Sequence, residues 1–255
     1  MIRFAYENDV RLIRELWDIA FPEESDFNSY FFENIFDHRN TLINIRDNEL
    51  LAMVQMMPYE IKNMGKVTYI YGAATNPKYR KQGLMSELLK KSFEIDKEKD
   101  VKASVLIPAN RPLFDFYGKL GYETAFYCHR EILKKGSRAE RAREAGYEDI
   151  PLLMDIYRGD VIRNFDYWKV QLDMYKALGG KIFIYKNAYA VVSDKIEEIM
   201  YSSKEEKECL ADFVCDYIKS DSVEVTEMGE DQPLGMIKKH REFDTDKMYM
   251  NLMFN

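Results

Sequence analysis

The apolar residues near the start of the chain recur at intervals of three and four positions. Such spacing places them on one face of a helix with 3.6 residues per turn, so it predicts an amphipathic helix over residues 10 to 20. Asp9 stands directly before this run and is the expected N-cap residue. The aromatic-rich stretch FNSYFFENIF, residues 27 to 36, predicts a second helix after the turn at Pro22.

A different pattern follows between residues 41 and 75. Three segments rich in strand-forming residues are TLINI (41 to 45), LLAMVQMM (50 to 57) and VTYIYGAAT (67 to 75). The short turns RDNE and KNMGK separate them, which predicts an antiparallel meander. Helical spacing returns after Gly83 and continues up to the charged stretch DKEKD.

The remainder of the first half alternates strands with a short helix. VKASVLIP (101 to 108) predicts a buried strand, RPLFDFYGKL (111 to 120) a helix that ends at Gly121, and YETAFYCHREIL another strand. The nearly all-polar stretch KKGSRAERARE is the expected joint between two domains. We therefore predict one domain over residues 1–135 and a second over residues 141–255.

The segments after this joint resemble the opening of the chain. AYENDVRLIRELWDIA, which starts at Ala5, aligns with AGYEDIPLLMDIYRGD, which starts at Ala145, so that Asp149 matches Asp9. The hairpin LINIRDNELLAMV likewise aligns with IFIYKNAYAVV. We interpret the similarity as an internal duplication, although two amphipathic helices and two hairpins resemble each other in any case. The second copy contains no counterpart of the basic turn described below.

Composition narrows the classes of protein that fit the chain. Apolar residues make up 46% and charged residues 32% of the 255 positions, which indicates a globular protein with a large core. The net charge of -7 disfavours a nucleic-acid or anionic-membrane binder and suits a small cationic partner, although solubility also explains it. The three cysteines lack CxxC spacing, and neither a secretory signal nor a membrane-spanning apolar run is seen, so we expect reduced thiols in a cytoplasmic protein.

A basic turn precedes the helix that starts after Gly83. In TNPKYRKQGLMSELLKK, Arg80 and Lys81 come shortly before the glycine, and a helix N-terminus presents backbone N–H groups without internal partners. Because glycine has no Cβ, an anion can approach the main chain closely, so the turn predicts a site for a diphosphate group. It is neither a Walker A loop nor a G-x-G-x-x-G fingerprint. The alternative is a solvated helix start whose basic side chains complement nearby acidic groups, which would have the same sequence pattern.

In its setting this turn resembles the cofactor motif of the GNAT superfamily of acetyl-CoA-dependent N-acyltransferases. A strand ending in GAATNP precedes it, and a helix, a strand and N-x6-Y-x3-G-Y follow it. The family pattern Arg/Gln-x-x-Gly-x-Gly/Ala corresponds to RKQGLM, in which Met85 replaces the small last residue. IRNFDYW, residues 162 to 168, resembles a stretch in the second, degenerate domain of enhanced-intracellular-survival-type acetyltransferases. Those proteins commonly carry a third domain of sterol-carrier-protein type, for which this chain has no room.

The resemblance implies an α/β (α+β) fold: a GNAT domain with a mixed, largely antiparallel central sheet, plus a second, smaller, degenerate GNAT-like domain. It implies acetyl-CoA as cosubstrate and no metal. The residues that it implies for binding are Ala73, Ala74 and Thr75 on the strand, Arg80, Lys81, Gln82, Gly83, Leu84, Met85 and Ser86 at the turn, and Asn110. Gly72 stands where the strand would bulge, and Asn110 is equally suited to cap the next helix.

The resemblance also implies two residues that take part in the chemistry. Tyr117 matches the family tyrosine that protonates the departing thiolate, and a phenol with a pKa near 10 stays protonated at neutral pH. Packing alone would also explain a tyrosine there. In two-domain relatives the carboxylate at the chain end reaches the active site, so the resemblance makes the α-carboxylate of Asn255 the expected base.

The expected acceptor is a primary amine on a small cation, which attacks the thioester directly in a ternary complex. The acidic loop residues Glu23, Glu24 and Asp26 would attract such a cation at the substrate mouth. A non-catalytic acyl-CoA-binding or regulatory module is the alternative, because no internal residue stands out as a base. We expect neither nucleic acid nor membrane as a partner and leave homo-oligomer formation open. None of the three histidines has His or Cys at i+3 or i+4, so no metal site is predicted.

Overall fold

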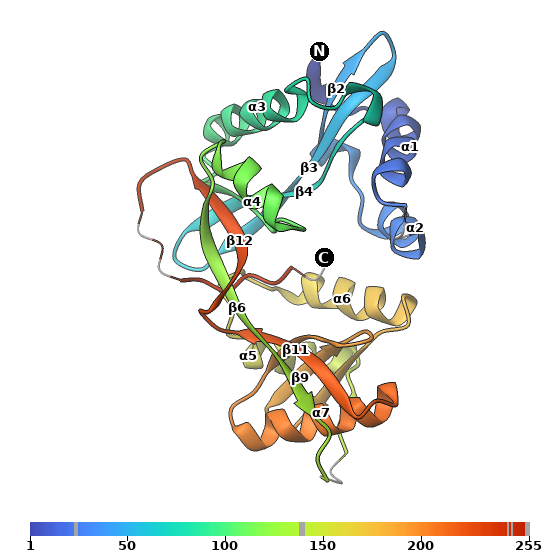
Figure 1. Cartoon of the computed structure of the whole chain (residues 1–255), viewed down its shortest axis with the longest axis vertical. Coiled ribbons are helices and arrows are strands. Elements are labelled where there is room, and N and C mark those ends of the chain that lie inside the picture. Colours follow the sequence, from blue (N-terminus) through green and yellow to red (C-terminus); the bar gives the residue numbers. More distant parts are fainter. Residues whose placement is uncertain (23–24, 138–140, 244, 246, 253–255) are drawn as a thin grey trace. The chain divides into compact units, whose positions relative to one another are not determined.

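Two groups of strands, each flanked by helices, organise the chain (Figure 1). The structure is a computed structural model and describes residues 1–22, 25–137, 141–243, 245 and 247–252. Contacts divide the chain into unit 1, Met1–Thr124 with Gly235–Thr245, and unit 2, Ala125–Leu234 with Asp246–Asn255. No helix of the described part is both long and apolar enough to cross a membrane.

Unit 1 contains a mixed, mostly antiparallel sheet. Its strands are β1 (Ile2–Phe4), β2 (Thr41–Arg46), β3 (Glu49–Ile61), β4 (Gly65–Thr75), β5 (Ala103–Leu106) and β12 (Gln232–Lys239), adjacent in that order. The predicted meander is confirmed as β2, β3 and β4, which pair antiparallel. Since the long helix α3 connects β4 to β5, these two strands run parallel.

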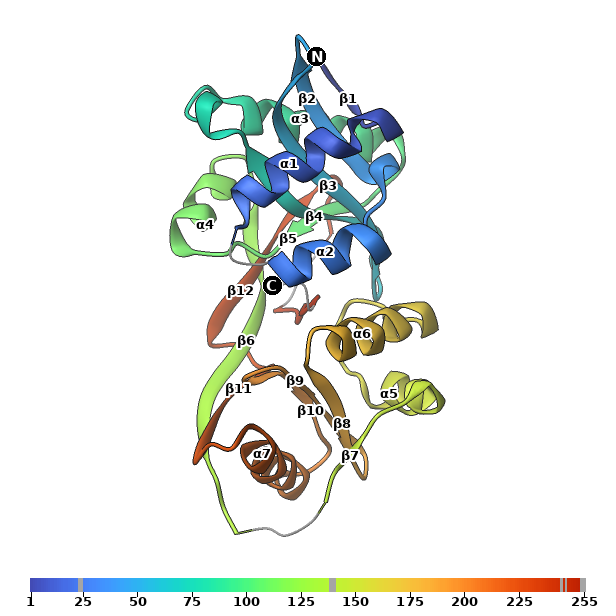
Figure 2. The same cartoon turned by 90° about the vertical axis from the view of Figure 1, so that its right-hand side faces the viewer.

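Helices cover both faces of this sheet (Figure 2). They are α1 (Val10–Ala20), α2 (Ser25–Asn34), α3 (Leu84–Glu98) and α4 (Arg111–Gly118), with the short 3-10 helices η1 (Glu7–Asp9), η2 (His38–Asn40) and η3 (Pro77–Tyr79) between elements. Apolar side chains of α1 and α2 form one core with the sheet, and those of α3 and α4 form another on the opposite face. Ile13, Leu16 and Trp17 of the predicted amphipathic stripe are fully buried, as their spacing requires.

Asp9 stands at the N-cap position of α1, as its place before the apolar run predicts. Its carboxylate makes no capping bond to that helix. It accepts instead from the backbone N–H of Tyr6 at 2.7 Å and from the guanidinium of Arg3 at 2.6 and 3.0 Å. The Arg3 hydrogen bond lowers the pKa of Asp9, because it stabilises the carboxylate. The carboxylate therefore binds two groups that precede it by three and six residues, rather than the helix N–H groups that the sequence suggested.

Unit 2 repeats the element order of unit 1. Its strands are β6 (Glu123–Lys134), β7 (Arg143–Glu144), β8 (Lys181–Tyr185), β9 (Ala188–Val192), β10 (Ile196–Met200) and β11 (Ser222–Met228), in the order β6-β11-β10-β9-β8-β7. Its helices are η4 (Tyr147–Asp149), α5 (Ile150–Ile156), α6 (Phe165–Ala177) and α7 (Lys204–Ile218). Asp149 accepts from Arg143 and from the N–H of Gly146, which matches the contacts of Asp9 residue for residue. This agreement supports the duplication.

The two halves of the chain exchange one strand each. In unit 1, β5 is bordered by β12 from the C-terminal half, with Met236 opposite Leu106. In unit 2, β11 is bordered by β6 from the N-terminal half, with Val225 opposite Glu131. The sequence predicted two domains that are each continuous in the chain. The contacts instead assign residues 235 to 245 to unit 1, although these residues follow most of unit 2 in the sequence. Because the residues paired in these two cases are 130 and 94 positions apart (236 − 106 and 225 − 131), no local sequence pattern predicts the pairing.

We therefore expect residues 1–135 alone to lack the stable fold of unit 1. Without β12, the edge of β5 is exposed, and losing the burial of Met236 and Ile237 costs roughly 3 to 6 kcal/mol. Thermal unfolding followed by circular dichroism should show a low or absent transition. Joining residue 124 to residues 232–243 through a Gly/Ser linker should restore it. A fragment 1–135 that melts as cooperatively as the full chain would contradict the strand exchange.

Candidate active site

The end of β4 is bent by a bulge. Met53 lies opposite Ala74 and Gln55 opposite Tyr71, so β4 contains one more residue than β3 in this interval. Gly72, inside the bulge, has a φ of 55°, and a Cβ built on it would lie 2.2 Å from the Trp17 ring. Only glycine fits, because the conformation and the packing each exclude a side chain.

Beyond the bulge, β4 parts from β5. The two strands pair only at Val67 to Tyr69, opposite Ala103 to Val105, in the part of the chain that the structure describes. The main chain at Ala73 to Thr75 therefore presents an edge toward β5 that no strand covers. Such an edge can pair with an extended ligand.

The basic turn after β4 is held by its own residues. Asn76 accepts from the N–H of Lys78 at 3.1 Å and donates to the carbonyl of Leu50 at 3.2 Å, which fixes the Asn-Pro corner. Arg80 donates through Nε to the carbonyl of Thr75 at 3.3 Å. Neither Arg80 nor Lys81 forms an ion pair with any described carboxylate, and both side chains are exposed. Their charge is thus available to an anion.

Helix α3 begins at this turn without a side-chain cap. Its N-cap is Gly83, whose φ of 79° is in the left-handed region and whose missing side chain leaves open space. The first intrahelical bond runs from Glu87 N–H to Gly83 at 3.0 Å, so the N–H groups of Leu84, Met85 and Ser86 have no partner within the helix. These groups and the helix dipole favour an anion.

A cavity of about 590 Å³ connects the strand edge with this turn. Predicted residues that line it are Ala73, Ala74, Thr75, Arg80, Lys81, Gly83, Leu84, Met85, Ser86 and Tyr117. Gln82 and Asn110 do not line it. Asn110 instead accepts from the N–H of Leu113 at 3.3 Å as the N-cap of α4, the alternative that its sequence position left open. Asn255 lies outside the described residues.

Five further lining residues were not predicted. They are Ala20 and Phe21 at the end of α1, Tyr79 in η3, and Leu113 and Phe116 in α4. The α4 residues could have been found from the sequence, since Leu113 precedes Phe116 by three and Tyr117 by four positions, which are helical intervals. Tyr79 donates to Glu49 at 2.6 Å, and this hydrogen bond raises the pKa of its phenol. Because Glu49 lies 30 residues before Tyr79, no local sequence pattern predicts this contact.

Tyr117 closes the α4 side of the cavity. Its side chain is 7% exposed and packs against Phe116 and Tyr122, with ring centroids 5.2 and 5.6 Å away. Burial raises the pKa of Tyr117 to about 12, because the phenolate would be poorly solvated. The hydroxyl therefore remains a proton donor throughout the neutral and mildly basic range.

Among the described residues that line the cavity there is no aspartate, glutamate or histidine. The cavity therefore combines a hydrogen-bonding strand edge, an anion-binding turn and one phenol. It can hold an extended anionic ligand and supply a proton, but none of its described residues is a neutral-pH base.

In unit 2, α7 corresponds to α3, and its N-terminus is capped by side chains. Ser203 caps α7 by accepting from the N–H of Glu206 at 3.2 Å, and the Glu206 carboxylate accepts from the N–H groups of Ser202 and Ser203 at 2.8 and 3.2 Å. Glu206 is buried. The hydroxyl of Ser203 thus binds the N–H of the third helical residue, which corresponds to the open N–H of Ser86 in unit 1, and the Glu206 carboxylate binds the two N–H groups just before the helix.

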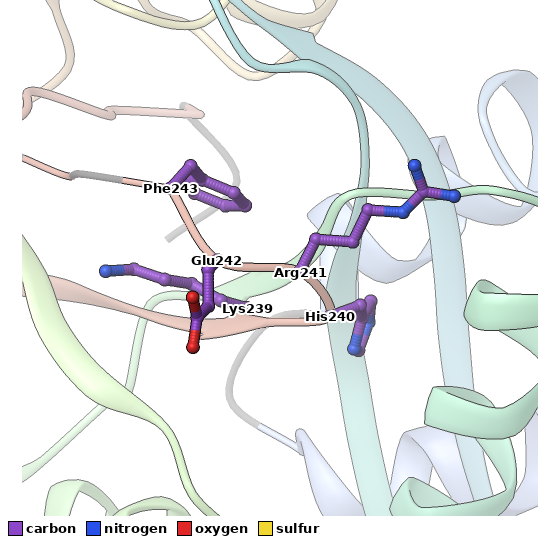
Figure 3. A pocket seen from close by; sticks show the side chains of 5 residues that line it. All are labelled: Lys239, His240, Arg241, Glu242 and Phe243. Carbon is purple, nitrogen blue, oxygen red and sulfur yellow. The ribbon is translucent and has the colours of Figure 1, made fainter.

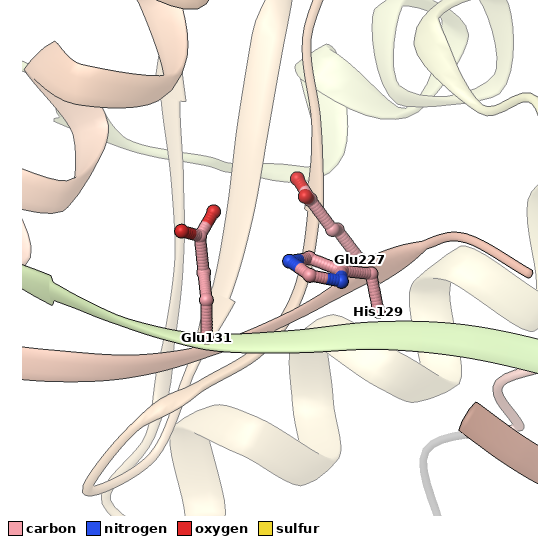
Figure 4. A group of neighbouring side chains, drawn as sticks. All are labelled: His129, Glu131 and Glu227. Atoms are coloured by element: carbon pink, nitrogen blue, oxygen red, sulfur yellow. The ribbon is translucent and has the colours of Figure 1, made fainter. Parts of the chain in front are cut away.

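Two other groups of polar side chains are internally paired. Beside the opening at Lys239 to Phe243 (Figure 3), Lys239 pairs with Glu123 at 2.8 Å and Arg241 with Asp100. In unit 2, His129, Glu131 and Glu227 lie close together (Figure 4). Lys207 donates to both carboxylates there, which raises its pKa against the effect of burial. A metal ion would have to displace this ammonium group.

Residues 1–125 match the family model described as Acetyltransferase (GNAT) domain. No curated protein matches the sequence. The GCN5-related N-acetyltransferases of Kribbella flavida and Anabaena variabilis ATCC 29413 are similar in structure, with 16% and 14% identity and TM-scores of 0.70 and 0.69. The matches cover 94% of this chain and 70% and 72% of those chains. Eis1 from Mycobacterium abscessus has 10% identity and a TM-score of 0.68, over 94% of this chain and 73% of that one.

At these identities the structural matches establish the fold, and the family model establishes the class of the N-terminal half. The strand bulge, the uncapped helix and the cavity are thus parts of an acyltransferase fold. Residues 1–125 therefore match the acetyltransferase domain of the GNAT family, a transferase family that uses acetyl-CoA.

Proposed function

We propose that this protein is an acetyl-CoA-dependent N-acetyltransferase that acetylates a primary amine on a small cationic acceptor. The observation that carries the proposal is the juxtaposition, in one cavity, of the uncovered β4 edge, the uncapped start of α3 and Tyr117. An acyl-CoA is an extended amide chain with a diphosphate at one end and a thioester at the other. Each of the three features suits one of these parts.

Each residue then has a defined task. The N–H groups of Leu84, Met85 and Ser86, with Arg80 and Lys81, would bind the diphosphate. The main chain of Ala73 to Thr75 would hold the pantetheine amides, and one N–H at the bulge would face the thioester oxygen as negative charge develops on it. The amine attacks the thioester carbon, the carbon–sulfur bond breaks, and Tyr117 donates its proton to the leaving thiolate.

The proton of the attacking amine needs a separate acceptor. Since no described lining residue is a base, water or the α-carboxylate of Asn255 would take it. Glu23 and Glu24, expected at the substrate mouth, lie outside the described residues, and Asp26 is exposed. The net charge of -7 favours a cationic acceptor.

The missing base also favours a second candidate, a non-catalytic acyl-CoA-binding or regulatory module. Incubation with acetyl-CoA and a panel of primary amines separates the two functions. An enzyme should release CoA thiol faster in the presence of an acceptor, and mass spectrometry should show the acetylated amine. Tight CoA binding without acceptor-dependent release would indicate the binding module, and absence of CoA binding would contradict both.

Removing the free charges of the turn should weaken CoA binding. We expect Arg80→Gln and Lys81→Gln each to raise the Kd for CoA about tenfold, because each removes a charge-assisted contact to phosphate. Isothermal titration calorimetry measures this. Lys78→Gln is the matched control, since Lys78 belongs to the same turn but pairs with Glu49 at 3.8 Å and does not line the cavity. Equal effects of all three variants would argue against a local diphosphate site.

A further inference from the structure

A second, smaller cavity lies on the face of the unit 1 sheet that α1 and α2 cover. Its volume is about 90 Å³. It is lined by Phe31, Ile35, Phe36, Asp37, Asn40, Gln55, Met57, Pro58 and Tyr59, which come from α2, the η2 region and β3. We call it the Gln55 cavity. Its lining is mostly aromatic and apolar, and its polar residues are Asp37, Asn40 and Gln55, of which Gln55 belongs to the sheet.

Gln55 is buried but incompletely paired. Its side chain is 2% exposed, and its Oε1 accepts from the hydroxyl of Thr41 at 3.0 Å. Its Nε2 has no hydrogen-bond partner in the described part of the chain. A buried amide N–H without an acceptor is rare in native proteins because burial removes its hydrogen bonds to water. In a cavity, such a donor is suited to a ligand oxygen.

The Gln55 cavity adjoins the bulge of β4. Gln55 lies opposite Tyr71, the residue before Gly72, so at about 3.3 Å per residue Ala73 and Thr75 are roughly 7 and 13 Å further along the strand. Phe31 in the cavity wall packs on Tyr71 and Trp17, with ring centroids 5.6 and 4.8 Å away. These aromatic residues and Ala74 belong to one core on the same face.

We propose that the Gln55 cavity binds the distal end of the amine acceptor, and that this end carries a hydrogen-bond-accepting oxygen, a hydroxyl or a carbonyl, bound by Gln55 Nε2. The inference rests on the proposed function and specifies its substrate class. The amine then lies at the bulge and the oxygen several bonds away from it. An engineered apolar cavity of about 150 Å³ binds benzene, so the Gln55 cavity of about 90 Å³ is sized for a smaller group such as a hydroxymethyl or an amide.

The test uses ω-amino alcohols from aminopropanol to amino-octanol, each paired with the alkylamine in which a methyl group replaces the hydroxyl. For the wild type, kcat/KM should favour the amino alcohol about tenfold at the chain length that spans the two sites. Gln55→Met should bring the ratio of kcat/KM for the amino alcohol to kcat/KM for the alkylamine near one. Methionine keeps the length of the side chain and removes the hydrogen-bond donor. The Kd for CoA should not change.

Gln171→Met is the matched control. Gln171 is also buried, and neither of its amide atoms has a partner in the described part of unit 2, so the substitution is the same but belongs to another core. It should keep the wild-type ratio. Gln55→Leu serves as a second variant if Gln55→Met does not fold. A wild type without the preference, or a ratio unchanged by loss of the Gln55 amide, would overturn the inference.

A binding measurement separates this inference from the proposed function. Trp17 stacks on Phe31 in the cavity wall, so tryptophan fluorescence should report titration with amino alcohols in the absence of acetyl-CoA. If no amine is acetylated but binding of amino alcohols still depends on Gln55, the cavity assignment holds and the acetyltransferase assignment fails. If binding is the same in wild type and Gln55→Met, the cavity assignment fails whatever the turnover.

Discussion

Tyr117→Phe should lower kcat by about 10²- to 10⁴-fold while leaving the Kd for CoA close to that of the wild type. The substitution removes the hydroxyl that would protonate the thiolate. The ring, which is buried against Phe116 and Tyr122, is kept, so the cavity should retain its shape. Stopped-flow or coupled detection of CoA thiol gives kcat, and calorimetry gives the Kd.

Tyr122→Phe is the appropriate control. Tyr122 is a buried neighbour whose hydroxyl shares a hydrogen bond of 2.6 Å with Ser104, and it does not line the cavity. We expect it to lower stability by about 1 kcal/mol and to keep kcat within about twofold. If Tyr117→Phe behaves in the same way as Tyr122→Phe, Tyr117 is a packing residue and its role as the acid is lost.

The raised pKa of Tyr117 also predicts a pH dependence. A phenol with a pKa of about 12 remains protonated, and hence competent as an acid, until the pH approaches that value. The rate should rise with pH as the acceptor amine loses its proton, without a descending limb below about pH 11. A decline of kcat between about pH 7 and 9 would indicate a different acid.

Arg163→Met should destabilise unit 2 by about 3 to 5 kcal/mol. Arg163 and Glu198 are both fully buried and form a bidentate pair at 2.5 and 2.9 Å. Burial by itself lowers the pKa of Arg163, but the charge of Glu198 outweighs that effect and raises it well above the ordinary value. Without the guanidinium, the carboxylate still accepts from the hydroxyls of Tyr189 and Tyr249, at 2.7 and 3.0 Å, but has lost its cationic partner.

Calorimetric or denaturant unfolding measures this loss. A double variant, Arg163→Met with Glu198→Met, is the informative comparison, because it removes both charges and leaves neither unpaired. It should be more stable than Arg163→Met alone. A double variant as unstable as the sum of the two single variants would show that the pair does not act as a unit.

Arg163 also holds the end of the chain. Its guanidinium donates to the carbonyl of Asn251, whose side chain donates to the carbonyl of Glu197 at 2.9 Å. Tyr249 is bound through its N–H to Asp160 at 2.6 Å. Arg163→Met should therefore increase proteolysis after residue 245, which mass spectrometry of the digest can locate.

Much of the fold of unit 1 could be predicted from local pattern. The helix over residues 10 to 20, the three-stranded meander and the turn before α3 all follow from periodicity and from glycine placement, because each depends on neighbours in sequence. The position of Asp9 at the N-cap of α1 also follows from local pattern, whereas the partner of its carboxylate does not. Its partner Arg3 is six residues away and on a separate strand, so geometry rather than capping preference decided the contact.

For the site, the family motif located the strand end, the turn and the tyrosine that line the cavity. It did not locate Phe21 or Tyr79, and it placed Asn110 at the cofactor although that side chain caps α4. The small Gln55 cavity had no sequence signal, since a glutamine in a strand is exceptional only once it is found buried and half-paired.

The sequence by itself determined the order of elements, the repetition of that order and the glycine-marked turn, because local sterics and the spacing of apolar residues control these features. Contacts between distant segments decided that β6 and β12 are exchanged and that Arg163 meets Glu198. These depend on which distant segments come into contact. Such contacts form when the cores close, and short-range patterns do not encode their partners.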